Sequence, residues 1–322
     1  MQTIPNRRSP EGVNPGRARR AVRHLYDHDH LEPGRMSMPL LVRSNGEVSG
    51  ELPGEIDLGG LAGEARRLAR LGLGGVKVFV TGHDRDAIAT GATAADNRMA
   101  RAIGEIKAAA PDLAVTTEVC GCSWTTSREC VLRKDGGLID LEATYALMGE
   151  MALLHAEAGA DAVSPTAMLD GSIRQVRDAL DAEGWRDVSV CPNIAVDGEL
   201  YEPFKTIMDT DPGTGRRAGL QLSSGRLVSG VLQCAEEWIV EGADSLTLQP
   251  VLTNIDGLTA LAGYTFNPIV AYSTSGEWAA LRHLPSSAVL DYHRMFLRLG
   301  ADHVLTYAAD VLADALRERE GH

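Results

Sequence analysis

Short runs of apolar residues recur along most of the chain and alternate with longer segments in which apolar residues return every three or four positions. The short runs have the length and composition of strands, and the longer segments have the period of helices. The short runs cover residues 38–42, 75–80, 113–119, 162–166, 188–193, 245–250, 269–275 and 303–308. The pattern therefore predicts eight strands.

The segments between these runs include 61–72, 97–111, 141–160 and 288–301, and several end in Gly-Ala-Asp just before the next strand. Glycine at that place closes a helix in the left-handed conformation. Eight alternating units predict an α/β fold, a (β/α)8 TIM barrel with its active site at the carboxyl ends of the strands. The alternative is a doubly wound open sheet, but the sequence has neither Gly-rich phosphate-loop motif that would favour it.

The first thirty or so residues differ from the rest of the chain because they are rich in Arg, Pro, Gly and Asp and show no sustained apolar period. A segment of this composition does not build a core of its own. We interpret residues 1–35 as an extended N-terminal arm that either docks on a neighbouring subunit or stays mobile. Residues 36–322 then form the barrel, and the arm predicts a homo-oligomer of two or more chains.

Composition narrows the class of ligand. The formal net charge is -13 and 44% of the residues are hydrophobic. This charge disfavours nucleic acid and anionic membrane as partners, because both attract clustered Lys and Arg. The chain has no apolar run of about 18 residues and its N-terminus lacks the apolar segment of a signal peptide. We expect a cytoplasmic protein that binds a small molecule.

Three of the five cysteines crowd into the stretch EVCGCSWTTSREC, where Cys120, Cys122 and Cys130 form the pattern C-x-C-x7-C. An odd number of clustered cysteines is a poor disulfide framework and indicates a metal or catalysis. Three thiols at a strand end can hold a tetrahedral Zn²⁺ and leave its fourth position open for water or substrate. The alternatives are incidental apolar packing and a closed structural site with a further ligand.

Lys77 is unusual because it lies inside the otherwise apolar run GVKVFV. The alternation of a strand places it on the same face as Phe79. If that face points into the barrel, Lys77 is a buried amine with a lowered pKa, suited to act as a base or an imine former. The alternative is that Lys77 points outward between helices and reaches solvent, since lysine is rarely buried without a partner.

Five motifs follow one another along the chain at residues 156–180, 200–205, 241–256, 271–282 and 300–312. In this order they resemble the porphobilinogen synthase family, whose enzymes are also called 5-aminolevulinate dehydratases. The resemblance runs from about Arg19 to Leu312, and the cysteine cluster is similar to the family's zinc-binding segment. It implies a (β/α)8 barrel with an arm that embraces a partner subunit in an assembly of up to eight chains.

The family's chemistry, by this resemblance, depends on two lysines that form imines with two molecules of 5-aminolevulinate. Gln249 stands at the position of the second lysine, and the run 194–197, where the first belongs, contains no lysine. An amide does not form an imine. Ala167 also replaces an acidic residue of the family's pocket. We therefore expect the chain not to be a true porphobilinogen synthase.

The resemblance implies a set of residues that bind the substrate carboxylate. They are Lys205, Arg216, Arg217, Gln221, Ser275 and Tyr307. Guanidinium groups bind carboxylates through two parallel hydrogen bonds, which suits an anionic substrate. The plainer interpretation of Arg216, Arg217 and Gln221 is a solvated polar loop.

The leading hypothesis is a zinc-dependent lyase or condensing enzyme that acts on a small amino or keto carboxylic acid. It would catalyse condensation, dehydration or C–N or C–C bond formation, and specialised metabolism is its expected setting. Catalysis is assigned to Glu118, Lys77, Tyr307, Ser275 and Gln249. One alternative is a catalytically silent homologue that binds a carboxylate or regulates a partner. Another is an enzyme of 5-aminolevulinate in which Lys77 has taken over imine formation.

Overall fold

A computed structural model describes residues 18–26, 30–44, 48–212 and 219–320 of the chain. Its strands are all parallel to their neighbours in one sheet. They are β1 (Met36–Arg43), β2 (Glu55–Asp57), β3 (Gly75–Val80), β4 (Ala114–Val119), β5 (Ala162–Pro165), β6 (Ser189–Val190), β7 (Asn193–Ala195), β8 (Leu246–Gln249), β9 (Ile269–Ser273) and β10 (His303–Thr306). The eight predicted strands are thereby confirmed.

The sheet closes into a barrel. Its order is β6-β5-β4-β3-β1-β10-β9-β8-β7, with β2 paired to β1. The two end strands, β6 and β7, are separated only by Cys191 and Pro192, so one extended segment joins both ends of the sheet. The amide of Cys191 donates to Val163 O (2.8 Å), and Thr247 N donates to Pro192 O (3.0 Å). The predicted (β/α)8 barrel is confirmed, and this closure excludes the open sheet.

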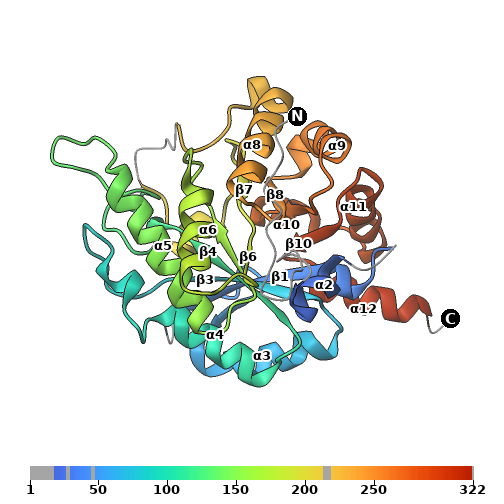
Figure 1. The fold of residues 1–322 in the computed structure, drawn as a ribbon. Coiled ribbons are helices and arrows are strands. Elements are labelled where there is room, and N and C mark those ends of the chain that lie inside the picture. Colours follow the sequence, from blue (N-terminus) through green and yellow to red (C-terminus); the bar gives the residue numbers. More distant parts are fainter. Residues whose placement is uncertain (1–17, 27–29, 45–47, 213–218, 321–322) are drawn as a thin grey trace.

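Helices surround the strands on the outside (Figure 1). Helix α3, for example, presents an apolar stripe to the barrel with the fully buried Leu61, Ala65 and Leu68. The helices are α2 (Arg20–Tyr26), α3 (Leu58–Arg70), α4 (Arg98–Ala109), α5 (Leu141–Glu157), α6 (Ser172–Ala182), α7 (Phe204–Met208), α8 (Leu227–Glu241), α9 (Ile255–Tyr264), α10 (Ser275–Leu281), α11 (Ser286–Arg298) and α12 (Ala309–Glu320). No helix in the described part of the chain is long and apolar enough to cross a membrane.

The described part of the predicted arm is not extended. Residues 20–26 form α2, whose Val22 and Leu25 are buried. The carbonyl oxygen of Leu25 lies 2.9 Å from Nδ1 of His303, at the start of β10, so α2 packs at the amino-terminal end of the barrel. Residues 1–17 lie outside the described residues, and the boundary at residue 35 stays a prediction.

Candidate active site and metal centre

A pocket lies at the carboxyl ends of the barrel strands, the end where a (β/α)8 barrel carries its active site. Strands β3, β4, β7, β8 and β9 each contribute a lining side chain, and the loops that follow them supply the rest. The pocket is lined by Phe79, Glu118, Cys120, Cys122, Cys130, Thr166, Asn193, Ala195, Tyr201, Phe204, Lys205, Leu220, Gln221, Gln249, Tyr272, Thr274 and Ser275. One cavity therefore holds most of the predicted site residues: the three thiols, Glu118, Lys205, Gln221, Gln249 and Ser275.

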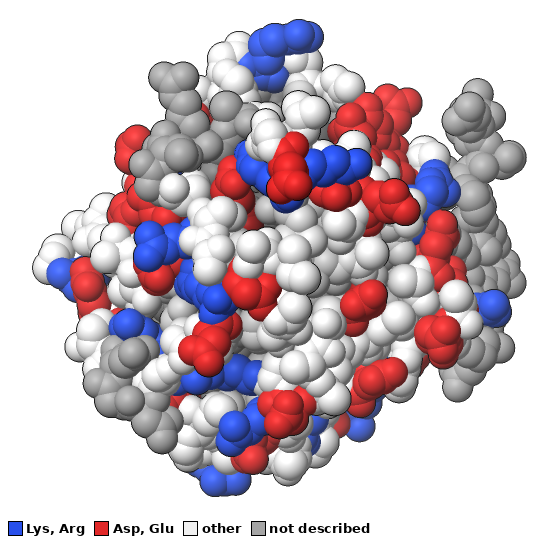
Figure 2. All heavy atoms as spheres, turned by 90° about the vertical axis from the view of Figure 1, so that its left-hand side faces the viewer, with Lys and Arg blue, Asp and Glu red and all other residues white. Residues whose placement is uncertain are grey.

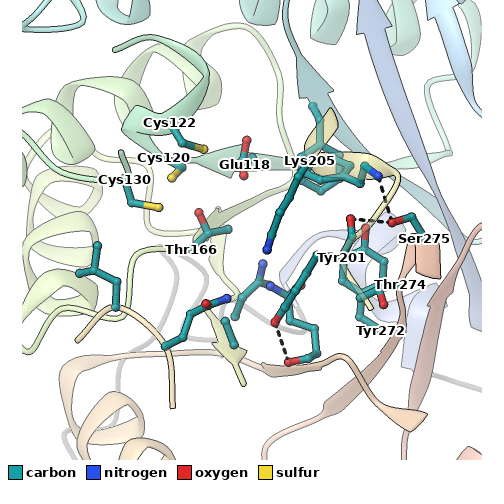
Figure 3. Close-up of a pocket in the computed structure, with 17 residues that line it drawn as sticks. Glu118, Cys120, Cys122, Cys130, Thr166, Tyr201, Lys205, Tyr272, Thr274 and Ser275 are labelled. Carbon is teal, nitrogen blue, oxygen red and sulfur yellow. Dashed lines mark hydrogen bonds between the residues drawn. The ribbon is translucent and has the colours of Figure 1, made fainter. Parts of the chain in front are cut away.

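The three clustered thiols form one wall of the pocket (Figure 3). Cys120 follows β4 directly, Cys122 lies in the short turn after it, and the loop brings Cys130 back beside them. Gly121 permits this return, because a Cβ at that position would lie 3.1 Å from the Cys130 carbonyl oxygen. The amide of Thr125 donates to Gly121 O (2.9 Å) and its hydroxyl donates to Glu129 O (3.0 Å), which fixes the loop.

The thiol geometry fits a metal ion. All three sulfur atoms are buried and lie within 4.8 Å of one another. Tetrahedral zinc with Zn–S bonds of about 2.3 Å would hold them about 3.8 Å apart. Hydrogen bonds from Cys122 and Cys130 lower the pKa of Cys120 well below its usual range. Within the described residues, these three form the one group of His, Cys, Asp or Glu side chains close enough to share a metal.

Lys77 points into the barrel, so the outward alternative is wrong. Its side chain is 3% exposed, and Nζ donates to Ser164 Oγ (2.8 Å) and Asn193 Oδ1 (2.9 Å). Burial lowers its pKa to about 8, although the nearby negative charge of Glu118 acts in the opposite direction. The buried amine thus has polar partners from two other strands, and these partners make its burial possible.

The two positions at which the resemblance expects imine-forming lysines lie side by side. Within the run 194–197, Ala195 is the residue that lines the pocket, and it pairs with Gln249 across β7 and β8. Neither side chain is an amine. Ala167, where the family has an acidic residue, is buried with the apolar residues that pack around the thiols.

Lys205, on α7, lies on the side of the pocket formed by the loop after β7 (Figure 3). Its Nζ is 5.2 Å from the centre of the Tyr201 ring, a cation–π distance. Tyr201 is held in turn, because its hydroxyl donates to Val196 O (2.9 Å) and to Gln249 O (3.1 Å). The loop therefore places the Lys205 ammonium group over the pocket. The Tyr201 hydroxyl ties this loop to the end of β8.

Ser275 lines the pocket, but its hydroxyl is engaged with the backbone. It donates to Tyr201 O (2.9 Å) and accepts from Phe204 N (3.2 Å). Tyr307 is fully buried and does not line the pocket; its hydroxyl lies 3.5 Å from that of Tyr272, which does. Both contacts give these residues a supporting place in the structure. Their predicted roles toward a carboxylate stay predictions.

Gln221 lies on the pocket wall, whereas Arg216 and Arg217 lie outside the described residues. The sequence did not single out Asn193 or Tyr272, although both line the pocket. Strand alternation was the signal that could have found Asn193, because it precedes Ala195 by two positions and shares its face.

The fold and the site define a (β/α)8 barrel protein with a small-molecule pocket walled by thiols at the carboxyl ends of its strands. The sequence profile described as delta-aminolevulinic acid dehydratase matches residues 13–315. The chain therefore belongs to the delta-aminolevulinic acid dehydratase family, whose members are dehydrating and condensing enzymes.

Named relatives and a solved structure agree with this assignment. The Bacillus subtilis delta-aminolevulinic acid dehydratase is 29% identical over 94% of this chain and 97% of its own length. The chloroplastic enzyme of Selaginella martensii is 32% identical over 90% of this chain and 73% of its own length. The crystal structure of the Toxoplasma gondii enzyme with its product porphobilinogen has a TM-score of 0.84 and 27% identity, covering 99% of this chain and 92% of that one.

Proposed function

We propose that this protein is a zinc-dependent enzyme that condenses or dehydrates a small amino or keto carboxylic acid without the two lysines expected from the family resemblance. The observation that carries the proposal is the composition of one pocket. It keeps three thiols and a cationic Lys205, yet Ala195 and Gln249 occupy the paired positions where the resemblance expects amines. A pocket of this composition supports the binding of an anion and a metal but not a two-imine reaction.

The thiols of Cys120, Cys122 and Cys130 would hold the metal, since thiolate ligands favour zinc over hard cations such as Mg²⁺. Bound zinc supplies Lewis-acid chemistry by polarising a carbonyl or lowering the pKa of a bound water. Three ligands from the protein leave one coordination position for that water or substrate.

The chain's own residues bind and orient the acid. Lys205 faces the pocket from above Tyr201 and would pair with the carboxylate, together with Gln221 and the predicted Arg216 and Arg217. Gln249 offers an amide that donates to a carbonyl oxygen and accepts from an amine.

The remaining proposed residues act at the edges of the pocket. Glu118, at the end of β4 and 8% exposed, would hold the proton or amine of the reacting group beside the thiols. Ser275 holds the Tyr201 loop, and Tyr307 supports Tyr272 from behind the pocket. These supporting contacts keep the walls in place while substrate binds.

The surface agrees with a small-molecule ligand. On the face in Figure 2, basic side chains are scattered among acidic ones and do not form a continuous basic area. We infer no nucleic-acid or membrane partner, a cytoplasmic location and a homo-oligomeric assembly. Light scattering of the full chain tests the assembly, and a monomer would refute it.

The function is tested by binding and turnover together. Zinc-loaded protein is titrated calorimetrically with short amino and keto acids, and the mixtures are then analysed for products by mass spectrometry. We expect binding that depends on the carboxylate, and a condensed or dehydrated product from at least one acid. Binding without any product across the set would favour the catalytically silent homologue, and no binding at all would refute both.

A further inference from the structure

Lys77, on β3, is a buried amine close to the pocket. In the register of the sheet its backbone pairs with Pro39 and Thr116, one layer deeper than the level at which Glu118 pairs with Ser164. The side chain extends one layer toward the carboxyl ends of the strands, because Nζ donates to Ser164 Oγ (2.8 Å) and Asn193 Oδ1 (2.9 Å). The amine therefore lies at the level of the Glu118 side of the pocket.

Three groups around this amine belong to the pocket lining. Asn193 accepts its hydrogen bond, and the ring centres of Phe79 and Tyr272 lie 5.8 and 6.0 Å from Nζ. Below, Lys77 lines a second cavity whose other walls include Val22 and Leu25. Lys77 itself is not among the residues that line the pocket above, so a substrate in that pocket meets the amine beneath Asn193, Phe79 and Tyr272.

We propose that Lys77 is an imine-forming amine that binds the ketone or aldehyde group of the substrate at the floor of the pocket. This inference rests on the proposed function in that the substrate is a keto acid held by its carboxylate. It places the reactive amine on β3, across the barrel from the β7 and β8 positions where the resemblance expects the imine-forming lysines.

The chemistry balances without a further reactant. The neutral amine attacks the carbonyl carbon, the N–C bond forms, and the electron pair of the C=O bond moves to oxygen, which takes up the first of the two amine protons. The hydroxyl group then leaves with the second amine proton as water while the nitrogen lone pair forms the C=N bond, so ketone and amine yield imine and water. Ser164 and Asn193 accept from Nζ and hold it in place during attack.

The surroundings of Lys77 favour this step over Lys107 and Lys134. Burial lowers its pKa to about 8, so that roughly a tenth of the amine is neutral at pH 7. Lys107 is instead bound by the carboxylate of Asp161 at 2.9 Å, and Lys134 is exposed. A desolvated amine beside a pocket is the usual form of an imine-forming lysine.

Borohydride trapping tests the inference. Full-length zinc-loaded protein is incubated with 4-oxopentanoate and cyanoborohydride, and its peptides are mapped by mass. We expect Lys77 to gain the mass of the acid less one oxygen, with little modification of Lys107 or Lys134. Lys77→Arg keeps the positive charge and should lose the adduct, whereas Lys205→Gln should reduce trapping without moving it to another site.

Pentanoate separates this inference from the proposed function, because it has the carboxylate but no carbonyl. Calorimetry should show pentanoate binding, and an excess of pentanoate should protect Lys77 from 4-oxopentanoate. Binding of both acids with no adduct on Lys77 would overturn the inference and leave the proposed function standing. Failure of both acids to bind would overturn both, and equal modification of all lysines would show that Lys77 has no special reactivity.

Discussion

Two walls of the same pocket differ in how many side chains of the family pattern they retain. The wall from β4 and its following loop carries Cys120, Cys122 and Cys130 in a geometry that fits a metal. The facing wall from β7 and β8 carries Ala195 and Gln249, paired in register, where the family resemblance expects amines. One wall thus matches the family pattern and the other departs from it within a single cavity.

The difference between the two walls indicates that the functional groups of this site can change independently of one another. In a (β/α)8 barrel each functional group comes from the end of a different strand, so one group can change while the frame and the other groups persist. The buried Lys77 of β3 donates hydrogen bonds to Ser164 of β5 and Asn193 of β7. We propose that the chemistry of this site has changed while the fold has persisted.

The thiol wall gives the largest expected effect. The protein as purified should hold close to one zinc per chain, and the triple change Cys120→Ser, Cys122→Ser and Cys130→Ser should remove all of it, because serine hydroxyls are poor zinc ligands. Cys234→Ser on α8 is the matched control and should keep the metal. Zinc content is measured by elemental analysis. Unchanged zinc in the triple variant would show that the thiol wall does not hold the metal.

Lys205 should affect ligand affinity. Lys205→Met removes the cation near Tyr201, and we expect the Kd of a carboxylate ligand to rise about ten- to a hundredfold, the usual size of a lost charged hydrogen bond. Lys134→Met, at an exposed lysine, is the matched control and should change nothing. Equal calorimetric affinities for both variants would place the carboxylate elsewhere.

The pH dependence of trapping at Lys77 should be about tenfold. Its pKa is lowered to about 8, and only the neutral amine attacks, so the yield of adduct rises as the pH is raised through 8 and falls below it. Between pH 7 and 9 the neutral fraction grows from roughly a tenth to roughly nine tenths. Mass mapping across this range measures it. A yield that is flat or declines with pH would argue against a free amine as the nucleophile.

Gln249→Lys should have the smallest effect. It restores one amine to the β8 wall, but Ala195 beside it and Ala167 near the thiols remain. Since residues that act as a unit are not additive, porphobilinogen formation from 5-aminolevulinate should stay undetected. Recovery of turnover in this single variant would show that the β7 position is dispensable.

Much of the fold was predictable because local periodicity carries it. Residues such as Leu61, Ala65 and Leu68 repeat at the spacing of one helix face, and the eight apolar runs each became strand. The helix α2 was not predictable from composition, since its burial depends on Val22 and Leu25 meeting residues distant in sequence.

The site was predictable where its groups are close in sequence. The cysteine spacing indicated one cluster, and the thiols do converge. Alternation placed Lys77 on the face of Phe79 but could not say which face points inward, because a strand in a barrel is buried on both sides. Its partners Ser164 and Asn193 come from other strands, so only the closed sheet brings them to the amine.

The most direct test of the account is a colorimetric assay for porphobilinogen with the unmodified, zinc-loaded protein and saturating 5-aminolevulinate, run beside the Bacillus subtilis relative. We predict no porphobilinogen from this chain, because the paired positions on β7 and β8 hold Ala195 and Gln249 and neither side chain forms an imine. Turnover near that of the relative would contradict it and would mean that the β7 and β8 wall is not needed for the family's reaction.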